Sequence, residues 1–102
     1  MSSGPVDFDY LASYAGGDRQ VVAEVLALFQ GQAEIWKGKL ASPDDGWRDL
    51  NHTIKGAARG IGAVALGEVA DRAEAGDPSM ALEVLGALGD VLGAIDSYVS
   101  LK

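Results

Sequence analysis

Apolar residues that recur every three or four positions constrain this chain most strongly. Between residues 18 and 40 they form one continuous stripe, while charged and amide side chains occupy the opposite face. This spacing places side chains on one side of an α-helix, so the segment predicts a helix of about six turns. The stripe comprises Val22, Val25, Leu26, Phe29, Ala33, Trp36 and Leu40.

Capping residues predict how the chain enters that long helix. Residues 1–6 lack the pattern and are expected to form a flexible leader. Asp7 suits the N-cap of a short helix over 7–14, because an aspartate side chain accepts hydrogen bonds from the free N–H groups of a first turn. Two consecutive glycines end this helix, and Asp18 is the expected N-cap of the long one.

A serine-proline pair predicts the start of the next helix. Serine suits an N-cap and proline the first helical position, so Ser42 and Pro43 predict a third helix over about 43–61. Gly62 is its expected end, because glycine readily adopts the left-handed conformation that terminates many helices. The apolar residues of this helix fall on one face: Trp47, Leu50, Ile54, Ala57 and Ile61.

Two more helices complete the chain, one over about 64–75 and one from 79 to near the end. The apolar face of the first holds Leu66, Val69, Ala70 and Ala73. Much of its other face holds Glu68, Asp71, Arg72 and Glu74. The expected buried stripe of the last helix is Leu82, Leu85, Leu88, Leu92, Ile95 and Val99.

These elements predict an all-α fold. No segment alternates apolar and polar residues with the period of two that is typical of a strand. Because the connections are short, consecutive helices are expected to run antiparallel, as an up-down-up-down four-helix bundle. The short additional N-terminal helix would lie across one end, and residues 7–102 would form a single domain.

Charge and composition exclude several classes of function. The formal net charge is −7, which argues against nucleic acids and anionic membranes as partners. There is no cysteine for a disulfide, a thiolate nucleophile or a metal site. The N-terminus does not resemble a signal peptide, and no apolar run is expected to reach the ~18–20 residues of a membrane span. We therefore expect a cytoplasmic protein, and a monomer.

The single histidine, His52, lies almost opposite the apolar face of the third helix on a helical wheel. Its neighbours at helical spacing are Arg48, Lys55, Gly56 and Arg59. Three of the eight basic residues of an acidic chain thus flank its only histidine. Positive charge there would favour a phosphoryl group or an acidic partner.

Gly56 follows His52 by one helical turn. Glycine within a helix costs roughly 1 kcal/mol relative to alanine, and one explanation is that it keeps the imidazole accessible to another molecule. These patterns alone leave an alternative open. An exposed histidine and a basic stripe are common on solvated helix faces, and Gly56 and Gly60 are also compatible with close helix packing.

The sequence from His52 to Gly62 resembles the signature of histidine-containing phosphotransfer (HPt) domains of two-component phosphorelays. That signature is a histidine, two residues, Lys-Gly, five residues and a glycine. His52, Lys55, Gly56 and Gly62 match every fixed position. The further residues that resemble the family are Leu50, Leu66 and Glu74.

The resemblance implies a role for each matched residue. His52 would accept the phosphoryl group, on the Nε2 nitrogen in this family. Lys55 would stabilise the phosphoryl charge and Gly56 would leave room for the partner. Gly62 would be structural and end the helix. From the wheel, Arg48 and Arg59 are further candidates for contacting the phosphoryl group or an acidic partner.

The resemblance also implies the partners, which would be response-regulator receiver domains and a hybrid histidine kinase. A receiver would supply the acceptor aspartate and a Mg²⁺ ion, so no cofactor is expected on this chain. No glycine-rich nucleotide loop is present, so ATP-dependent autokinase activity is not expected. In the family the second helix contributes to docking, which makes Val21, Val25 and Leu28 candidates, although each is more readily explained as an ordinary core residue.

Two other functions compete with a phosphorelay. A helical adaptor would dock a receiver or kinase through the same face without phosphorylation. An acid–base enzyme would use Asp71 and Glu74, but a solvated helix face explains this pair more simply. Serine-histidine-aspartate hydrolysis is not supported, because the sequence offers no obvious acid to orient His52 on the face of its own helix.

Overall fold

The computed structural model describes residues 4–43 and 45–100, and these contain helices and no strand. The helices are α1 (Phe8–Tyr14), α2 (Arg19–Ala41), α3 (Trp47–Gly60), α4 (Val64–Ala75), a short 3₁₀ helix (Pro78–Met80) and α5 (Ala81–Ser100).

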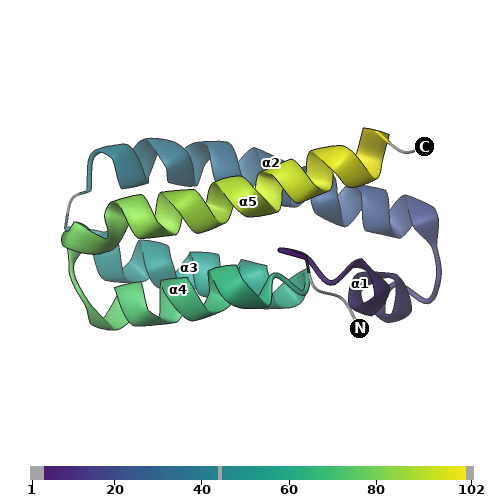
Figure 1. The fold of residues 1–102 in the computed structure, drawn as a ribbon, viewed down its shortest axis with the longest axis horizontal. Coiled ribbons are helices and arrows are strands. Elements are labelled where there is room, and N and C mark those ends of the chain that lie inside the picture. The colour runs from purple at the N-terminus through teal and green to yellow at the C-terminus, as the bar shows by residue number, and fades with distance from the viewer. Residues whose placement is uncertain (1–3, 44, 101–102) are drawn as a thin grey trace.

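The helices α2 to α5 run up, down, up and down around a shared core (Figure 1). In this bundle α2 packs against α3 and α5, and α4 packs against the same two helices. The predicted all-α fold and antiparallel bundle are confirmed.

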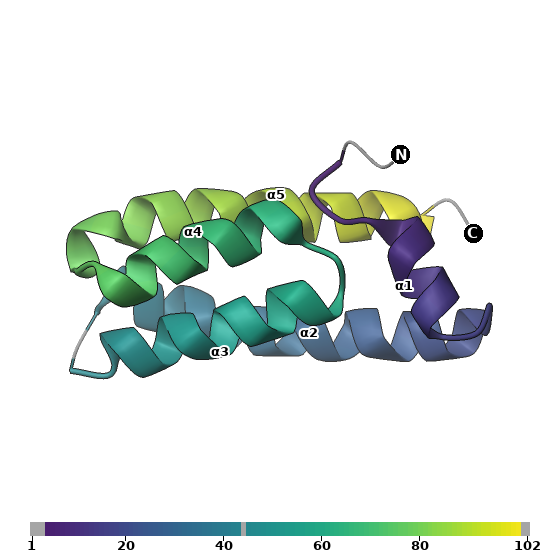
Figure 2. The ribbon, with the colours of Figure 1, turned by 90° about the horizontal axis from the view of Figure 1, so that it is seen from below.

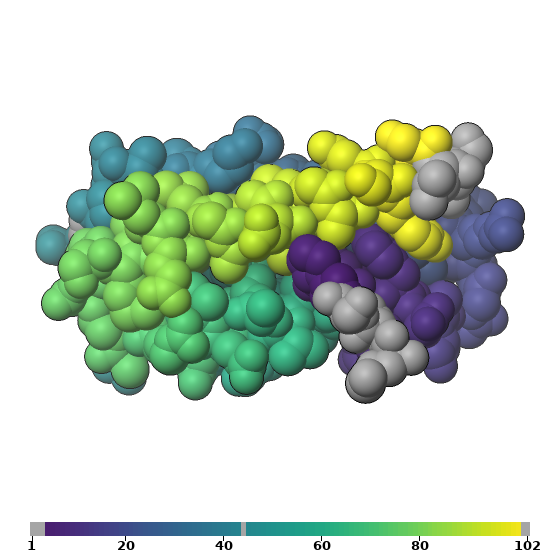
Figure 3. Space-filling model, viewed as in Figure 1, coloured from purple at the N-terminus to yellow at the C-terminus, as the bar shows by residue number. Residues whose placement is uncertain are grey.

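The short helix α1 covers the end of the bundle where α3 and α4 stop and α2 and α5 continue (Figure 2). The ring of Phe8 in α1 stacks on Tyr98 in α5, with 4.2 Å between the centroids. The segment that leads into α1 lies between α5 and the start of α4 (Figure 3). The predicted position of the N-terminal helix, across one end, is therefore confirmed.

Local capping explains where the first two helices begin. The Asp7 carboxylate accepts a hydrogen bond from the N–H of Tyr10 at 3.0 Å, one turn into α1. The Asp18 carboxylate accepts from Gln20 and Val21 at the start of α2. Both N-caps follow the sequence prediction because they depend only on neighbouring residues.

The start of α3 differs from the prediction. The helix begins at Trp47 rather than at 43, and Ser42 is instead the C-cap of α2. The connection between the two antiparallel helices uses the residues in between, of which 44 lies outside the described part. The buried Trp47 indole donates a hydrogen bond to the carbonyl of Ala73 at 2.8 Å, which anchors the first turn of α3 on α4.

The other end of α3 closes through backbone hydrogen bonds. The N–H of Ala63 donates to the carbonyl of Ala58 at 2.8 Å, and the N–H of Gly62 donates to Arg59 at 3.3 Å. This is the Schellman arrangement, which requires a left-handed residue. Gly62 supplies it, with a φ of +77°.

The buried faces of the helices agree with the predicted stripes in α2, apart from Val25, which is only partly buried. In α5 the prediction is wrong for two residues, because Leu82 is 82% exposed and Val99 is 47% exposed. Apolar residues surround most of α5, so its sequence is compatible with more than one buried face. Packing on α2 and α4 selects the face with Val84, Leu88, Val91 and Ile95.

The expected leader also differs in part. Residues 1–3 lie outside the described residues, but Val6 is 1% exposed and belongs to the core. The next residue, Asp7, donates its backbone N–H to the carbonyl of Gly62 at 2.9 Å. The segment just before α1 is thus held against the α3–α4 turn.

The segment Pro78–Ser100 corrects a further expectation. Among the described residues it is long and apolar enough to cross a membrane by length and composition alone, although no such run was expected. Core packing accounts for part of this composition, because Val84, Leu88, Val91 and Ile95 of this segment are buried against other helices.

Candidate functional site

His52 lies near the middle of α3 with its side chain 68% exposed. Residues on the other side of the helix, among them Ile54 and Ala58, are fully buried. The buried face also includes Asn51, which the apolar pattern did not identify and which donates a hydrogen bond to the carbonyl of Trp47. The core therefore orients α3 so that the imidazole faces solvent.

An acidic residue on the neighbouring helix contacts the imidazole. Oε2 of Glu74, in the last turn of α4, lies 3.1 Å from Nδ1 of His52. The Glu74 side chain is only 18% exposed, so its interpretation as part of a solvated face is wrong. The sequence of α3 alone does not reveal this contact, because only the packing of α4 on α3 brings Glu74 to His52.

Lys55 joins the same group of side chains. Its ammonium nitrogen lies 2.6 Å from Oε1 of Glu74 and 3.2 Å from Oδ1 of Asp71. The Lys55 side chain is 17% exposed, and that of Asp71 is 57% exposed. His52, Glu74, Lys55 and Asp71 thus form a continuous chain of contacts between α3 and α4, which we call the His52 cluster.

The contacts within the cluster favour the charged forms of Glu74 and Lys55. The hydrogen bond from Lys55, followed by that from His52, lowers the pKa of Glu74 below its ordinary value. The hydrogen bonds to Glu74 and then to Asp71 raise the pKa of Lys55. At neutral pH the cluster therefore holds a carboxylate and an ammonium ion.

The carboxylate of Glu74 also determines the imidazole tautomer. An ionised carboxylate only accepts hydrogen bonds, so the contact with His52 requires a proton on Nδ1. In a neutral imidazole the lone pair then resides on Nε2. The arrangement presents a nucleophilic nitrogen on an exposed ring whose other nitrogen is held by the protein.

The surface beside the imidazole is uncovered. A Cβ atom added at Gly56 would meet no other atom within 4 Å, and the same holds at Gly60 one turn later. Neither glycine is therefore required for close packing between helices. On the side from which another molecule would approach His52, no side chain projects from these two positions of α3.

The two candidate arginines occupy different places. Arg48 lines a polar cavity of about 430 Å³ together with Lys55, Asp71 and Glu74. Arg59 lines another cavity, next to Asp7 and Gly62 at the α3–α4 turn, so the structure does not bring it into the His52 cluster. Within the described part of the chain, neither arginine forms an ion pair.

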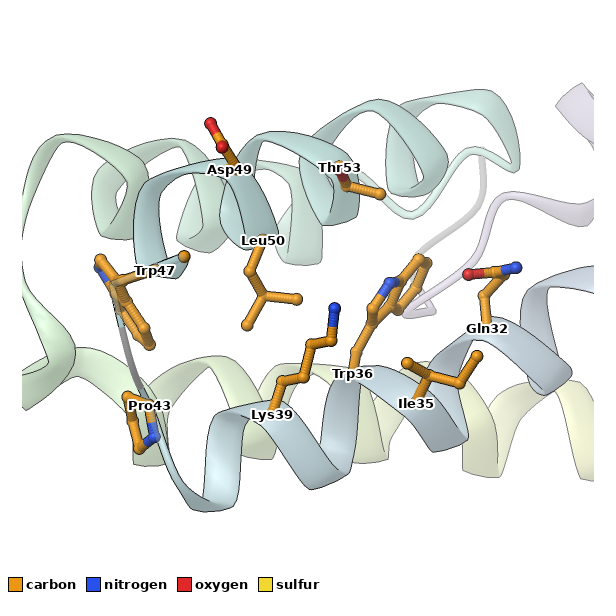
Figure 4. A pocket seen from close by; sticks show the side chains of 10 residues that line it. Gln32, Ile35, Trp36, Lys39, Pro43, Trp47, Asp49, Leu50 and Thr53 are labelled. Atoms are coloured by element: carbon orange, nitrogen blue, oxygen red, sulfur yellow. The ribbon is translucent and has the colours of Figure 1, made fainter.

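A groove runs along the other flank of α3, between this helix and α2. One part is a hollow of about 400 Å³ into which Trp36, Lys39 and Leu50 point (Figure 4). A second hollow of about 430 Å³ adjoins it, since Gln32 and Trp36 line both. The second hollow is further lined by Tyr10, Tyr14, Val25, Leu28, Phe29, Ala57, Gly60 and Ile61.

Three residues of α2 were candidates for docking. Leu28 is 71% exposed and Val21 is 39% exposed, so their interpretation as core residues is wrong. Val25 is partly buried and packs against the core. The sequence signal for Leu28 was its place outside the apolar stripe of α2, whereas the exposed rings of Tyr10 and Tyr14 were missed because α1 was expected only to cap the bundle.

A solved structure matches this fold over almost the entire chain. It is the crystal structure of the histidine phosphotransferase ShpA from Caulobacter crescentus, with a TM-score of 0.83. The two sequences are 48% identical, and the match covers 97% of this chain and 100% of that one. Neither the protein-family models nor the curated proteins compared with the sequence match it.

Identity at this level over the full length implies common ancestry as well as a common fold. The same conclusion follows independently from the motif at His52, Lys55, Gly56 and Gly62. This chain belongs to the histidine phosphotransferase family of phosphorelay proteins.

Proposed function

We propose that this protein accepts a phosphoryl group on Nε2 of His52 from one receiver domain and passes it to another. The observation that carries the proposal is the contact of Nδ1 with Glu74 at 3.1 Å. It holds the proton of a neutral ring on Nδ1 and leaves the lone pair on the exposed nitrogen, which is the arrangement of histidine that attacks phosphorus.

In the proposed transfer, the Nε2 lone pair forms a bond to the phosphorus of an aspartyl phosphate on the receiver. The P–O bond to the aspartate breaks, and its electron pair returns to the carboxylate. The proton stays on Nδ1, so the ring becomes cationic, and the Glu74 carboxylate stabilises that charge at 3.1 Å. The onward transfer follows the same path in reverse.

Two neighbours of His52 are proposed to assist. Lys55 has the only ammonium group within the cluster and would stabilise the phosphoryl charge, since a phosphoryl group has about two negative charges at neutral pH. Gly56 would admit the receiver to the ring, because nothing occupies the space where its Cβ would stand. Arg48 would add an unpaired positive charge at the edge of the cluster.

The groove between α2 and α3 is the proposed docking surface. It lies beside the His52 face, and its exposed apolar residues include Leu28 on α2 and Tyr14 on α1. Central apolar residues that are buried on binding typically dominate the energy of an interface. We therefore expect Leu28 to contribute more to receiver binding than to the stability of the bundle.

The residues of this chain also suggest which groups the receiver must supply. We propose no ATP-dependent kinase activity and no resident cofactor for this chain, with Mg²⁺ and the acceptor aspartate supplied by the receiver. A hybrid histidine kinase would be the upstream donor. The proposed setting is the cytoplasm, where the protein would act as a diffusible monomer.

The test mixes a receiver phosphorylated with labelled phosphate with this protein and with its His52→Gln variant. We expect acid-labile label on the wild-type protein and none on the variant. Binding of the receiver by both proteins without uptake of label would instead establish the adaptor function. Incubation of the pure protein with labelled ATP should leave it unlabelled, and robust labelling would contradict the absence of kinase activity.

A further inference from the structure

Lys55 is shared between two carboxylates, although one would be enough to hold it. Glu74 contacts it at 2.6 Å, and both side chains are largely shielded from solvent, at 17% and 18% exposed. Asp71 adds a second, longer contact at 3.2 Å from an exposed position. The contact with Asp71 therefore needs an explanation beyond anchoring the lysine.

We propose that Asp71 limits how much of the Lys55 charge is available to a phosphoryl group on His52, and thereby keeps that group easy to pass on. The inference rests on the proposed phosphotransfer function and names a further residue that tunes it. Asp71 acts through Lys55, so it is a positioning residue and not a catalytic one.

The contacts separate the role of Asp71 from that of Glu74. The two carboxylate oxygens of Glu74 contact different residues: Oε2 contacts His52 and Oε1 contacts Lys55. Asp71 contacts Lys55 and makes no recorded contact with His52. Removal of the Asp71 carboxylate thus leaves the imidazole and the closer ion pair of Lys55 in place.

The charge balance gives the direction of the effect. Lys55 contributes one positive charge, while Glu74 and Asp71 contribute one negative charge each, so these three side chains have a net charge of −1. A phosphoryl group adds about two further negative charges. Without the Asp71 charge, the same group would form beside side chains whose charges cancel, and Lys55 would be offset by one carboxylate instead of two.

The expected size of the effect is modest. Asp71 is exposed, so its interaction with the phosphoryl group is weakened by water and by salt, which screens charges over ~10 Å at 0.1 M ionic strength. We expect the Asp71→Asn variant to retain roughly two to five times more phosphoryl group at equilibrium than the wild type.

The experiment equilibrates a phosphorylated receiver with each protein and measures the ratio of label on His52 to label on the receiver. Asp71→Asn should raise this ratio two- to fivefold at low salt, with a smaller rise at 0.5 M salt. Asp71→Glu, which restores the charge, should return the ratio to that of the wild type. The matched control is Asp90→Asn, which removes one negative charge from the exposed surface of α5 and should leave the ratio unchanged.

The outcomes distinguish this inference from the function on which it rests. If the wild type takes up no label, the phosphotransfer function itself is wrong, and the role of Asp71 is wrong with it. If the wild type is labelled but Asp71→Asn gives the same ratio as Asp90→Asn, or a lower one, only the role of Asp71 is overturned. Circular dichroism and thermal unfolding of Asp71→Asn check that the bundle is intact.

Discussion

Nδ1 of His52 lies 3.1 Å from Oε2 of Glu74, a residue 22 positions further along the chain. The two side chains meet because α3 and α4 are antiparallel and joined by the short turn around Gly62. Glu74 also contacts Lys55, so one carboxylate links the imidazole to the ammonium group of Lys55. This link makes Glu74 the residue whose loss should affect the site most, after His52 itself.

We expect Glu74→Gln to slow phosphoryl transfer by about ten- to a hundredfold, the usual scale when a histidine loses the carboxylate that orients it. A glutamine retains a hydrogen-bond acceptor but neither stabilises the cationic ring nor pairs with Lys55. The measurement is the rate of label transfer from a phosphorylated receiver. The control is Glu83→Gln. This substitution removes an exposed ion pair between Glu83 in α5 and Arg72 in α4, outside the His52 cluster, and should leave the rate unchanged.

The ion pair between Glu74 and Lys55 should also make stability depend on pH. The folded protein lowers the pKa of Glu74 below its ordinary value of 4.5, so the carboxylate stabilises the fold above that pH. This contribution disappears as the pH falls through the lowered pKa, because protonation then favours the unfolded chain. For Lys55, whose pKa is raised above 10.5, the contribution is present below that pH and is lost as the pH rises through the raised value.

The check compares urea unfolding of the wild type and of Glu74→Gln at several pH values. The difference in free energy of unfolding should shrink steadily as the pH falls below 4.5. A difference that grows on acidification would have the wrong sign and would contradict the ion pair.

Substitutions at Gly56 should affect the stability of the fold and the rate of phosphoryl transfer in different ways. We expect Gly56→Ala to raise the free energy of unfolding by about 0.5–1 kcal/mol, because alanine is favoured in helices and its Cβ meets no other atom. Gly56→Leu should stay helical but slow transfer, since the side chain would stand between His52 and the receiver. The matched control is Gly89→Leu, at an equally open position on α5, where transfer should not change.

Leu28 tests the docking groove. A charge at this exposed position should disturb the apolar contact with a receiver but not the core, so we expect Leu28→Glu to weaken receiver binding roughly tenfold or more. Titration calorimetry or fluorescence binding measures the effect. Leu82→Glu places the same charge on an exposed leucine of α5, and equal weakening by both variants would rule out the groove as the docking surface.

Gly62 and Gly60 form a matched pair for stability. A Cβ at Gly62 would lie 3.0 Å from the ring of Tyr10 and 3.1 Å from the carbonyl of Asp7, in a left-handed conformation. Gly62→Ala should therefore lower the free energy of unfolding by about 1–3 kcal/mol. Gly60→Ala, at an open position in α3, should leave it unchanged or raise it slightly, and equal losses at both positions would contradict this account.

Features that depend on neighbouring residues could be predicted from the sequence. The caps at Asp7 and Asp18 and the bounds of α4 are set by local hydrogen bonds and by helical periodicity, so they could be predicted accurately. The exposure of His52 follows from the same periodicity, because the apolar face of α3 fixes which side turns outwards. The HPt motif likewise lies within one continuous stretch of chain.

Features that depend on how the helices pack could not be predicted from local patterns. Trp47 starts α3 later than the serine-proline pair suggested, because its indole is anchored on α4. The buried face of α5 was selected by its neighbours from a helix that is apolar around most of its surface. The pairing of Glu74 with His52 and Lys55 has the same origin. No local pattern encodes it, since the residues are distant in the chain and meet only when α4 packs against α3.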